Sequence, residues 1–208
     1  PARSVMSVFM ERNVGLLALF GIASIAVVFA PPVELLGLPI GLVVAALVLA
    51  FLAANVVIAT PRAYRVIDYL IVLTPLVRLR SRAQSLYEAV VPYRTAWRPM
   101  AAALVLSFFF QAVVILVVFL NAKALAVDVP LAALAVFVPL ISLAGMLPIS
   151  VNGLGVREGL YLLLLGRVGV PADVAVSMAL LYFVVTVMAS LPGGVVYALQ
   201  NTPVLERE

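Results

Sequence analysis

The sequence contains neither cysteine nor histidine. Without cysteine there can be no disulfide bond, no thiolate catalysis and no metal site with cysteine ligands. Without histidine the chain lacks the side chain that most often acts as a general base and most often binds transition metals. Charge is scarce as well, because Asp, Glu, Lys and Arg together make up 11% of the residues. We therefore expect no metal, no cofactor and no enzymatic activity.

Hydrophobic residues make up 66% of the 208 residues. Several apolar stretches exceed the roughly 20 residues that cross a bilayer as a helix. This composition predicts an all-α, polytopic integral membrane protein, in which close helix packing forms the core of the bundle. We expect a single transmembrane domain over residues 1–208, because no soluble domain, flexible linker or clear repeat is visible.

The basic residues are unevenly distributed. Seven of the thirteen lie between Pro61 and Arg98, together with only two acidic residues, Asp68 and Glu88. Basic stretches beside membrane spans lie on the cytoplasmic side, and apolar residues among arginines fit helices along the inner leaflet. We interpret residues 61–98 as a cytoplasmic or interfacial segment of the domain, and we expect no binding of nucleic acid.

This orientation assigns the long apolar runs to membrane spans. Val14–Ala30 should leave the cytoplasm, about Leu35–Thr60 should return, and about Met100–Asn121 should cross again. The last run, from Pro171 to about Gln200, should cross back inward. The chain would then end in the cytoplasm.

The region between the last two spans does not resemble a further crossing. Pro139 interrupts the apolar run Leu131–Leu147. Gly159–Gly166 would be only about 12 Å long as a helix, against roughly 30 Å of hydrocarbon. The simplest arrangement is a re-entrant, broken-helix hairpin that enters from the outer side, with Ser150–Glu158 at its tip inside the protein.

The tip combines flexible backbone with charge. Gly153 and Gly155 permit positive φ and a close approach to the backbone. A helix that starts after them would direct its unpaired N–H groups at the turn, and Arg157 adds a guanidinium suited to phosphate. Broken helices of this kind hold anionic substrates in many transporters, and Glu158 could neutralise Arg157 in the empty site. The predicted substrate-binding residues of the tip are Asn152, Gly153, Gly155, Arg157 and Glu158.

Polar residues in such a chain can also serve structure alone. The tip could be an Asn-Gly turn at the membrane surface, with Arg157 extending to the lipid headgroups. Alternatively, Arg157 and Glu158 could pair with polar groups of neighbouring helices. For Asn55 and Gln111, which are single polar residues within spans, interhelical hydrogen bonds are the favoured interpretation.

A second helix break is predicted at Leu191–Gly194. Proline removes a backbone donor and glycine loosens packing, so a kink or an unwound turn is expected there. We therefore add Tyr182, Pro192, Gly193 and Gly194 to the predicted substrate-binding residues, with Tyr197 as a further candidate. The alternative is that Gly193 and Gly194 form a close helix contact.

Several motifs of the second half carry a family resemblance. They are Leu147-Pro148-Ile149-Ser150, Gly153-Leu154-Gly155-Val156-Arg157-Glu158-Gly159, Leu165-Gly166 up to Pro171, Leu180-Leu181-Tyr182 and Leu191-Pro192-Gly193-Gly194. In this order they resemble the flippase-like membrane family, also called the lysylphosphatidylglycerol synthase transmembrane region. The chain departs from the family pattern at Val151 and Asn152, which replace a proline and a glycine, and at Phe183, where a basic residue is common.

The chain resembles the C-terminal two thirds of that domain. Since it begins with Pro1 rather than Met, we expect a fragment that lacks the N-terminal helices. The resemblance implies that the protein binds or translocates a phospholipid or an isoprenoid-linked lipid across the cytoplasmic membrane of a bacterium or archaeon. Its expected ligands are membrane lipids with an anionic or lipid-linked headgroup; the oligomeric state is not indicated.

Two other functions are compatible with the sequence. The main alternative is a non-transporting membrane partner that anchors a lipid-modifying glycosyltransferase or synthase. An enzyme with Glu158 as base, assisted by Asp128 or Asp173, is the weakest interpretation, because no nucleophile or metal cluster accompanies these acids. Family members fused to a soluble synthase domain are associated with aminoacylated phosphatidylglycerol. No such domain is present in this sequence, so aminoacyl transfer is not predicted.

Overall fold

The computed structural model describes residues 2–35, 37–59, 97–146, 153 and 155–199. Its helices are α1 (Ala2–Ala26), α2 (Ile40–Ala59), α5 (Trp97–Ala124), α6 (Leu131–Gly145), α7 (Val156–Gly166) and α8 (Ala172–Leu199). The strands β1 (Glu34–Leu35) and β2 (Leu38–Pro39) pair in an antiparallel hairpin. The predicted all-α class is confirmed, whereas most of the basic segment 61–98 lies outside the described residues.

Among the described residues, two helices are long and apolar enough to cross a membrane, α5 over Arg98–Ala124 and α8 over Ala172–Tyr197. Shorter apolar helices cover Ile40–Val56 and Leu131–Gly145. Large apolar side chains on α5 face outward, including Leu106 and Phe109, each with 67% of its surface exposed. In water so much exposed apolar surface would favour association, whereas in lipid it is the expected exterior.

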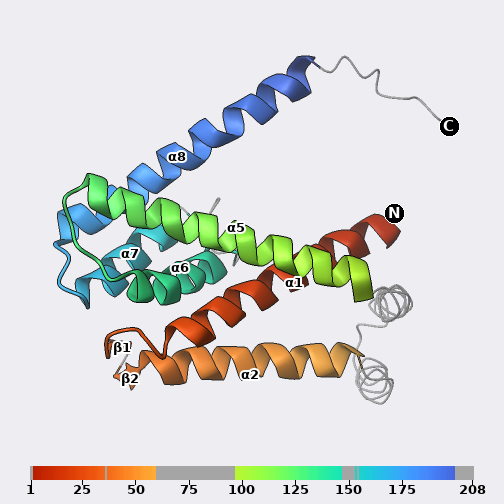
Figure 1. Ribbon diagram of the computed structural model, residues 1–208, viewed down its shortest axis with the longest axis horizontal. Helices are drawn as coiled ribbons and strands as arrows, with labels where there is room; N and C mark the ends of the chain where they lie inside the picture. The colour runs from red at the N-terminus through yellow and green to blue at the C-terminus, as the bar shows by residue number, and fades with distance from the viewer. Residues whose placement is uncertain (1, 36, 60–96, 147–152, 154, 200–208) are drawn as a thin grey trace, which may run out of the picture.

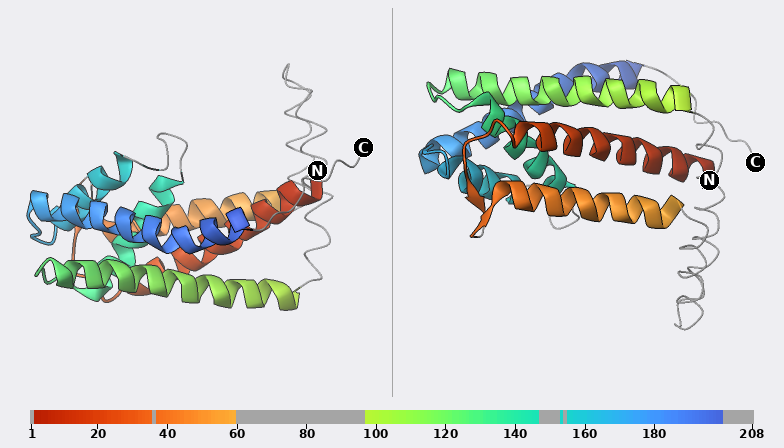
Figure 2. Two further views of the ribbon diagram at one scale, coloured as in Figure 1. Left: turned by 90° about the horizontal axis from the view of Figure 1, so that it is seen from above. Right: turned by 60° about the horizontal axis from the view of Figure 1, so that its bottom comes forward.

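The helices pack around α1 and the short pair α6 and α7. In the right-hand view of Figure 2, α5, α1 and α2 lie side by side, with α1 in the middle. Helix α6 packs against α1 and α5, and α7 packs against α6 and α8. The hairpin, the end of α5 and the start of α8 lie at one end of the molecule (Figure 1).

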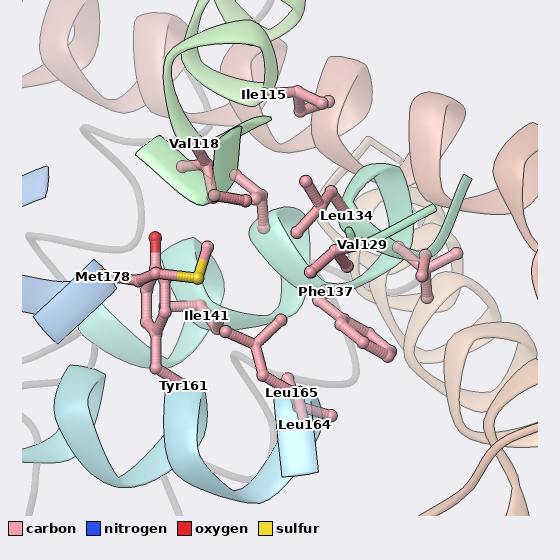
Figure 3. Packing of buried hydrophobic residues seen from close by; sticks show 14 of the residues in the cluster. Ile115, Val118, Val129, Leu134, Phe137, Ile141, Tyr161, Leu164, Leu165 and Met178 are labelled. Carbon is pink, nitrogen blue, oxygen red and sulfur yellow. The ribbon is translucent and has the colours of Figure 1, made fainter. Parts of the chain in front are cut away.

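The core lies where α6 and α7 meet the longer helices. Its largest fully buried side chains include Val118, Leu134, Phe137, Leu164 and Met178, which Figure 3 shows. Helices α1 and α5 approach closely at Gly21, where a Cβ atom would lie 2.8 Å from Cζ of Phe108 and would force this ring to shift. The packing of small against large side chains therefore fixes the position of α1 beside α5.

The first two helices differ from their predicted boundaries. Helix α1 begins at Ala2 instead of Val14, and it ends at Ala26 instead of Ala30. The second helix starts at Ile40, because Glu34–Leu35 and Leu38–Pro39 before it pair as strands. Hydropathy did not reveal this hairpin, since it depends on a turn at Gly37, which has φ +78°.

Two prolines that were expected to interrupt helices do not. Pro139 lies within α6 and Pro192 lies within α8, and both helices are continuous. A proline in a helix interior costs about 3 kcal/mol in water, partly through one lost hydrogen bond. In an apolar environment water does not compete for the remaining hydrogen bonds, so the helix persists. The predicted unwound turn at Leu191–Gly194 is therefore wrong.

A polar contact links α1 to α2. The amide nitrogen Nδ2 of Asn13 donates to Oδ1 of Asn55 at 2.8 Å, and Nδ2 of Asn55 donates to the carbonyl of Phe51 at 2.9 Å. The predicted interhelical role of Asn55 is confirmed. The same prediction fails for Gln111, whose buried Oε1 has no hydrogen-bond partner among the described residues.

The segment after α5 carries an exposed ion pair. Lys123 hydrogen-bonds Asp128, and its ammonium lies 5.6 Å from the ring centre of Phe119. The hydrogen bond and charge of Lys123 hold the pKa of the Asp128 carboxyl below its ordinary value of 3.8. The pair is therefore present above that value and is lost as the pH falls through the lowered pKa. Because both groups are exposed, its effect on stability is small.

Helix α5 ends in a Schellman motif. The Val127 N–H donates to the carbonyl of Ala122 at 3.0 Å, and the Ala126 N–H donates to the carbonyl of Lys123 at 3.0 Å. This pattern requires a left-handed residue just beyond the helix. Ala126 occupies that position with φ 55°, although its Cβ makes the conformation costly.

Helix α7 ends in the same way. The Val170 N–H donates to the carbonyl of Leu165 at 3.1 Å, and the Gly169 N–H donates to the carbonyl of Gly166 at 3.2 Å. Here the left-handed position, with φ 82°, is occupied by glycine. A Cβ at Gly169 would meet no atom within 4 Å, so only the backbone conformation opposes a larger residue there.

These two caps predict opposite mutational effects. Ala126→Gly should stabilise the protein by up to about 1 kcal/mol, because it relieves the left-handed strain of a residue with a Cβ. Gly169→Ala should destabilise it by a similar amount. The melting temperature of each variant in detergent measures both effects. Shifts of the same sign would contradict the shared cap geometry.

Candidate functional site

The turn before α7 is held by two glycines in the left-handed region, Gly153 with φ 75° and Gly155 with φ 83°. Gly153 is buried, and a Cβ atom there would lie 3.4 Å from Cα of Gly145 at the end of α6. That distance is an ordinary van der Waals contact, so glycine is favoured at Gly153 by its positive φ. Asn152, the other predicted residue of the turn, lies outside the described residues.

Glu158 stabilises the start of α7. Its Oε2 accepts a hydrogen bond of 2.6 Å from the backbone N–H of Gly155, the residue that precedes the helix. This is the carboxylate half of a capping box; the other half cannot form, because Gly155 has no side chain. The negative charge also lies at the positive end of the helix dipole. Glu158 thus orders the backbone of the turn.

Arg157 does not pair with Glu158. Its guanidinium carbon lies 5.2 Å from the ring centre of Tyr182 on α8, a cation–π contact between two half-buried side chains. Within the described ranges no carboxylate lies at ion-pair distance from Arg157. The predicted neutralisation by Glu158 is therefore not observed.

The contact with Tyr182 leaves the hydrogen-bond donors of Arg157 available. A guanidinium carries its N–H groups in its own plane, and a cation–π contact through its central carbon does not use them. Tyr182, predicted to line the same cavity, thus lies beside Arg157. Whether either residue binds a lipid stays a prediction.

The second predicted segment lies elsewhere. Pro192, Gly193 and Gly194 are exposed, and they begin ten residues beyond Tyr182, about 15 Å along a continuous helix. A Cβ atom at either glycine would meet no described atom within 4 Å. These glycines therefore neither reach Arg157 nor form a close helix contact in the described part of the chain. Tyr197, 81% exposed, lies still further along α8.

One residue of the site was missed from the sequence. Tyr161 lies one helical turn after Arg157 on α7, with only 2% of its surface exposed. It belongs to the buried cluster that includes Met178 of α8, and Tyr182 packs against the same cluster. Its spacing of four residues from Arg157 puts the two on one face of a helix, and this was the signal available in the sequence. The apolar run around it suggested packing alone.

The cap on α7 leads to a test of stability. Glu158→Ala should destabilise the protein by about 1 kcal/mol, because Gly155 N–H loses its acceptor and the helix loses a favourable charge. Glu158→Gln keeps an acceptor and should have an intermediate melting temperature in detergent.

The matched control is Asp173→Ala, which removes an acidic residue from the first turn of α8. The Asp173 carboxylate forms no hydrogen bond within the described part of the chain, so this variant should lose less stability. A larger loss for Asp173→Ala than for Glu158→Ala would refute the capping role.

Comparison with known proteins extends these observations. A family model described as the lysylphosphatidylglycerol synthase TM region matches residues 1–193. This family connects the chain with membrane proteins of lipid metabolism or transport. The comparison with curated proteins and the comparison with solved structures gave no match. Since the family model covers most of the sequence, the chain belongs to the family of the lysylphosphatidylglycerol synthase TM region.

Proposed function

We propose that this protein binds a phospholipid or an isoprenoid-linked lipid by its phosphate and translocates it across the cytoplasmic membrane of a bacterium or archaeon. The observation that carries the proposal is Arg157, a half-buried arginine without a carboxylate partner among the described residues. In an apolar environment such a charge is costly, and a ligand phosphate would balance it. The first-turn N–H groups of α7 lie beside it and favour the same anion.

The site would lie within the membrane. Helix α6 has 15 residues and α7 has 11, so they are about 22 Å and 16 Å long, short of the roughly 30 Å of hydrocarbon. Both connect to their long neighbours at the same end of the molecule, through residues 125–130 and 167–171. We therefore interpret α6 and α7 as a re-entrant hairpin, with Arg157 near its tip.

No chemical step is part of this proposal. Glu158, the nearest candidate base, is engaged with the backbone N–H of Gly155. Its hydrogen bond serves the fold of the turn, which leaves binding and movement as the roles for the site. The protein would thus hold the phosphate without breaking a bond in the lipid.

Arg157 can be tested by lipid exchange in reconstituted liposomes. If its guanidinium binds phosphate through two parallel hydrogen bonds, Arg157→Lys keeps the charge but loses this geometry. Both Arg157→Lys and Arg157→Ala should then slow the exchange of labelled phospholipid by about tenfold to a hundredfold.

The matched control is Arg167→Ala, at an exposed arginine just after the same helix. It should exchange lipid at the normal rate. Unchanged exchange by well-folded Arg157→Ala would remove this residue from the pathway. Wild-type protein that binds lipid but never exchanges it would favour the alternative, a non-transporting membrane partner of a lipid-modifying enzyme.

The proposed topology can be tested by single cysteines, since the chain has none of its own. Cysteines at Ala126, Leu131 and Arg167 should react with an impermeant reagent from the outer face, because each lies at the same end of the helices. A cysteine at Ser81, in the basic segment, should react from the cytoplasmic face. Labelling of Leu131→Cys and Arg167→Cys from opposite faces would exclude the hairpin.

A further inference from the structure

The guanidinium of Arg157 has no polar partner that would fix its position. Among the described residues it forms neither an ion pair nor a hydrogen bond, and the side chain is half-buried. An arginine side chain has several rotatable bonds and loses much conformational freedom when it is held in one geometry. A site that binds phosphate through this group therefore needs another contact that keeps the guanidinium in place.

The ring of Tyr182 can provide this contact because the ring is itself held by packing. Tyr182 packs against the buried cluster of the core, and it follows the fully buried Met178 by four residues, one turn along the same face of α8. An aromatic side chain has only two rotatable bonds, so little freedom remains to it once it is packed. The ring is therefore the fixed member of the pair, and Arg157 is the member that adapts.

The attraction between the two side chains is electrostatic. The guanidinium carbon lies over the ring, 5.2 Å from its centre. The negative face of an aromatic ring attracts a cation over roughly 6 Å, more strongly where water is excluded. Without the ring, the long side chain of Arg157 would be free to extend toward the lipid headgroups. The contact thus keeps the cation beside the start of α7, where the helix N–H groups favour the same anion.

We propose that Tyr182 is a positioning residue, which holds Arg157 in the conformation that binds the lipid phosphate. This inference rests on the proposed function. The aromatic contact persists when lipid is bound, because it uses none of the hydrogen-bond donors of the guanidinium. The apparent affinity for lipid is then proportional to the fraction of molecules in which Arg157 lies over the ring. A ring that attracts the cation less strongly lowers this fraction and weakens binding.

The test varies the charge on the ring face and leaves the size of the ring almost unchanged. Tyr182→Phe is compared with variants in which this phenylalanine carries one, two or three ring fluorines, since each fluorine withdraws electrons from the face that attracts the cation. The purified full chain in detergent binds short-chain phosphatidylglycerol as the probe. Relative to Tyr182→Phe, binding should weaken stepwise, by about tenfold with three fluorines. Binding of diacylglycerol of the same chain length, which has no phosphate, should not change.

The matched control is the same series at Tyr197, which is 81% exposed on the same helix and should give constant affinity. Equal affinity across the Tyr182 series would mean that the ring serves packing alone, which refutes the positioning role while the proposed function stands. Binding that tightens with fluorination would mean that the ring competes with phosphate for Arg157, which refutes the role as well. If the wild type does not prefer phosphatidylglycerol to diacylglycerol, the proposed function is refuted, and the role of Tyr182 with it.

Discussion

The positive φ of Gly153 and Gly155 in the turn before α7 is the constraint on which the site depends. Helices α6 and α7 have 15 and 11 residues, too few for either to cross a bilayer alone. Gly153 brings the turn against the end of α6, and Glu158 then binds the N–H of Gly155. These contacts set where α7 begins, and hence where Arg157 lies.

Adjacent charges of opposite sign have separate partners in this turn. The carboxylate of Glu158 binds backbone, whereas the guanidinium of Arg157 lies over the ring of Tyr182. An ion pair between them would satisfy both charges and leave little to attract a ligand. The aromatic contact instead stabilises the cation without occupying its hydrogen-bond donors. Glu158 thus orders the turn, whereas Arg157 supplies the available positive charge.

The helices were largely predictable, because prolines and glycines lie at the ends of the long apolar runs. The sequence could not distinguish a proline that precedes a helix, such as Pro130 before α6, from one that lies inside it, such as Pro139. That outcome depends on packing and on the absence of competing water. For the same reason the predicted helix break at Leu191–Gly194 is absent, since Pro192 lies in a continuous helix.

Only part of the candidate site could be predicted, because packing between helices is not visible in the sequence. Glycines and charges between apolar runs marked the turn around Arg157 directly. Tyr161 was not found, because an aromatic residue in an apolar run is usually core. Only the packing of α7 against α8 reveals that its side chain is buried where Tyr182 also packs. The partner of Glu158 was equally hidden, since it is a backbone group of the turn.

The attachment of α2 gives the bundle a mechanical asymmetry. At one end the Ile40 N–H binds the carbonyl of Val33, and some 22 Å along the helix Asn55 is bound to Asn13. Two hydrogen bonds this far apart oppose both tilting and rotation of α2 relative to the rest of the bundle. The C-terminal half of α8, exposed from Thr186 to Tyr197, has no such attachment within the described chain. Lateral displacement of a helix is therefore opposed at α2, and it breaks the fewest contacts at the C-terminal half of α8.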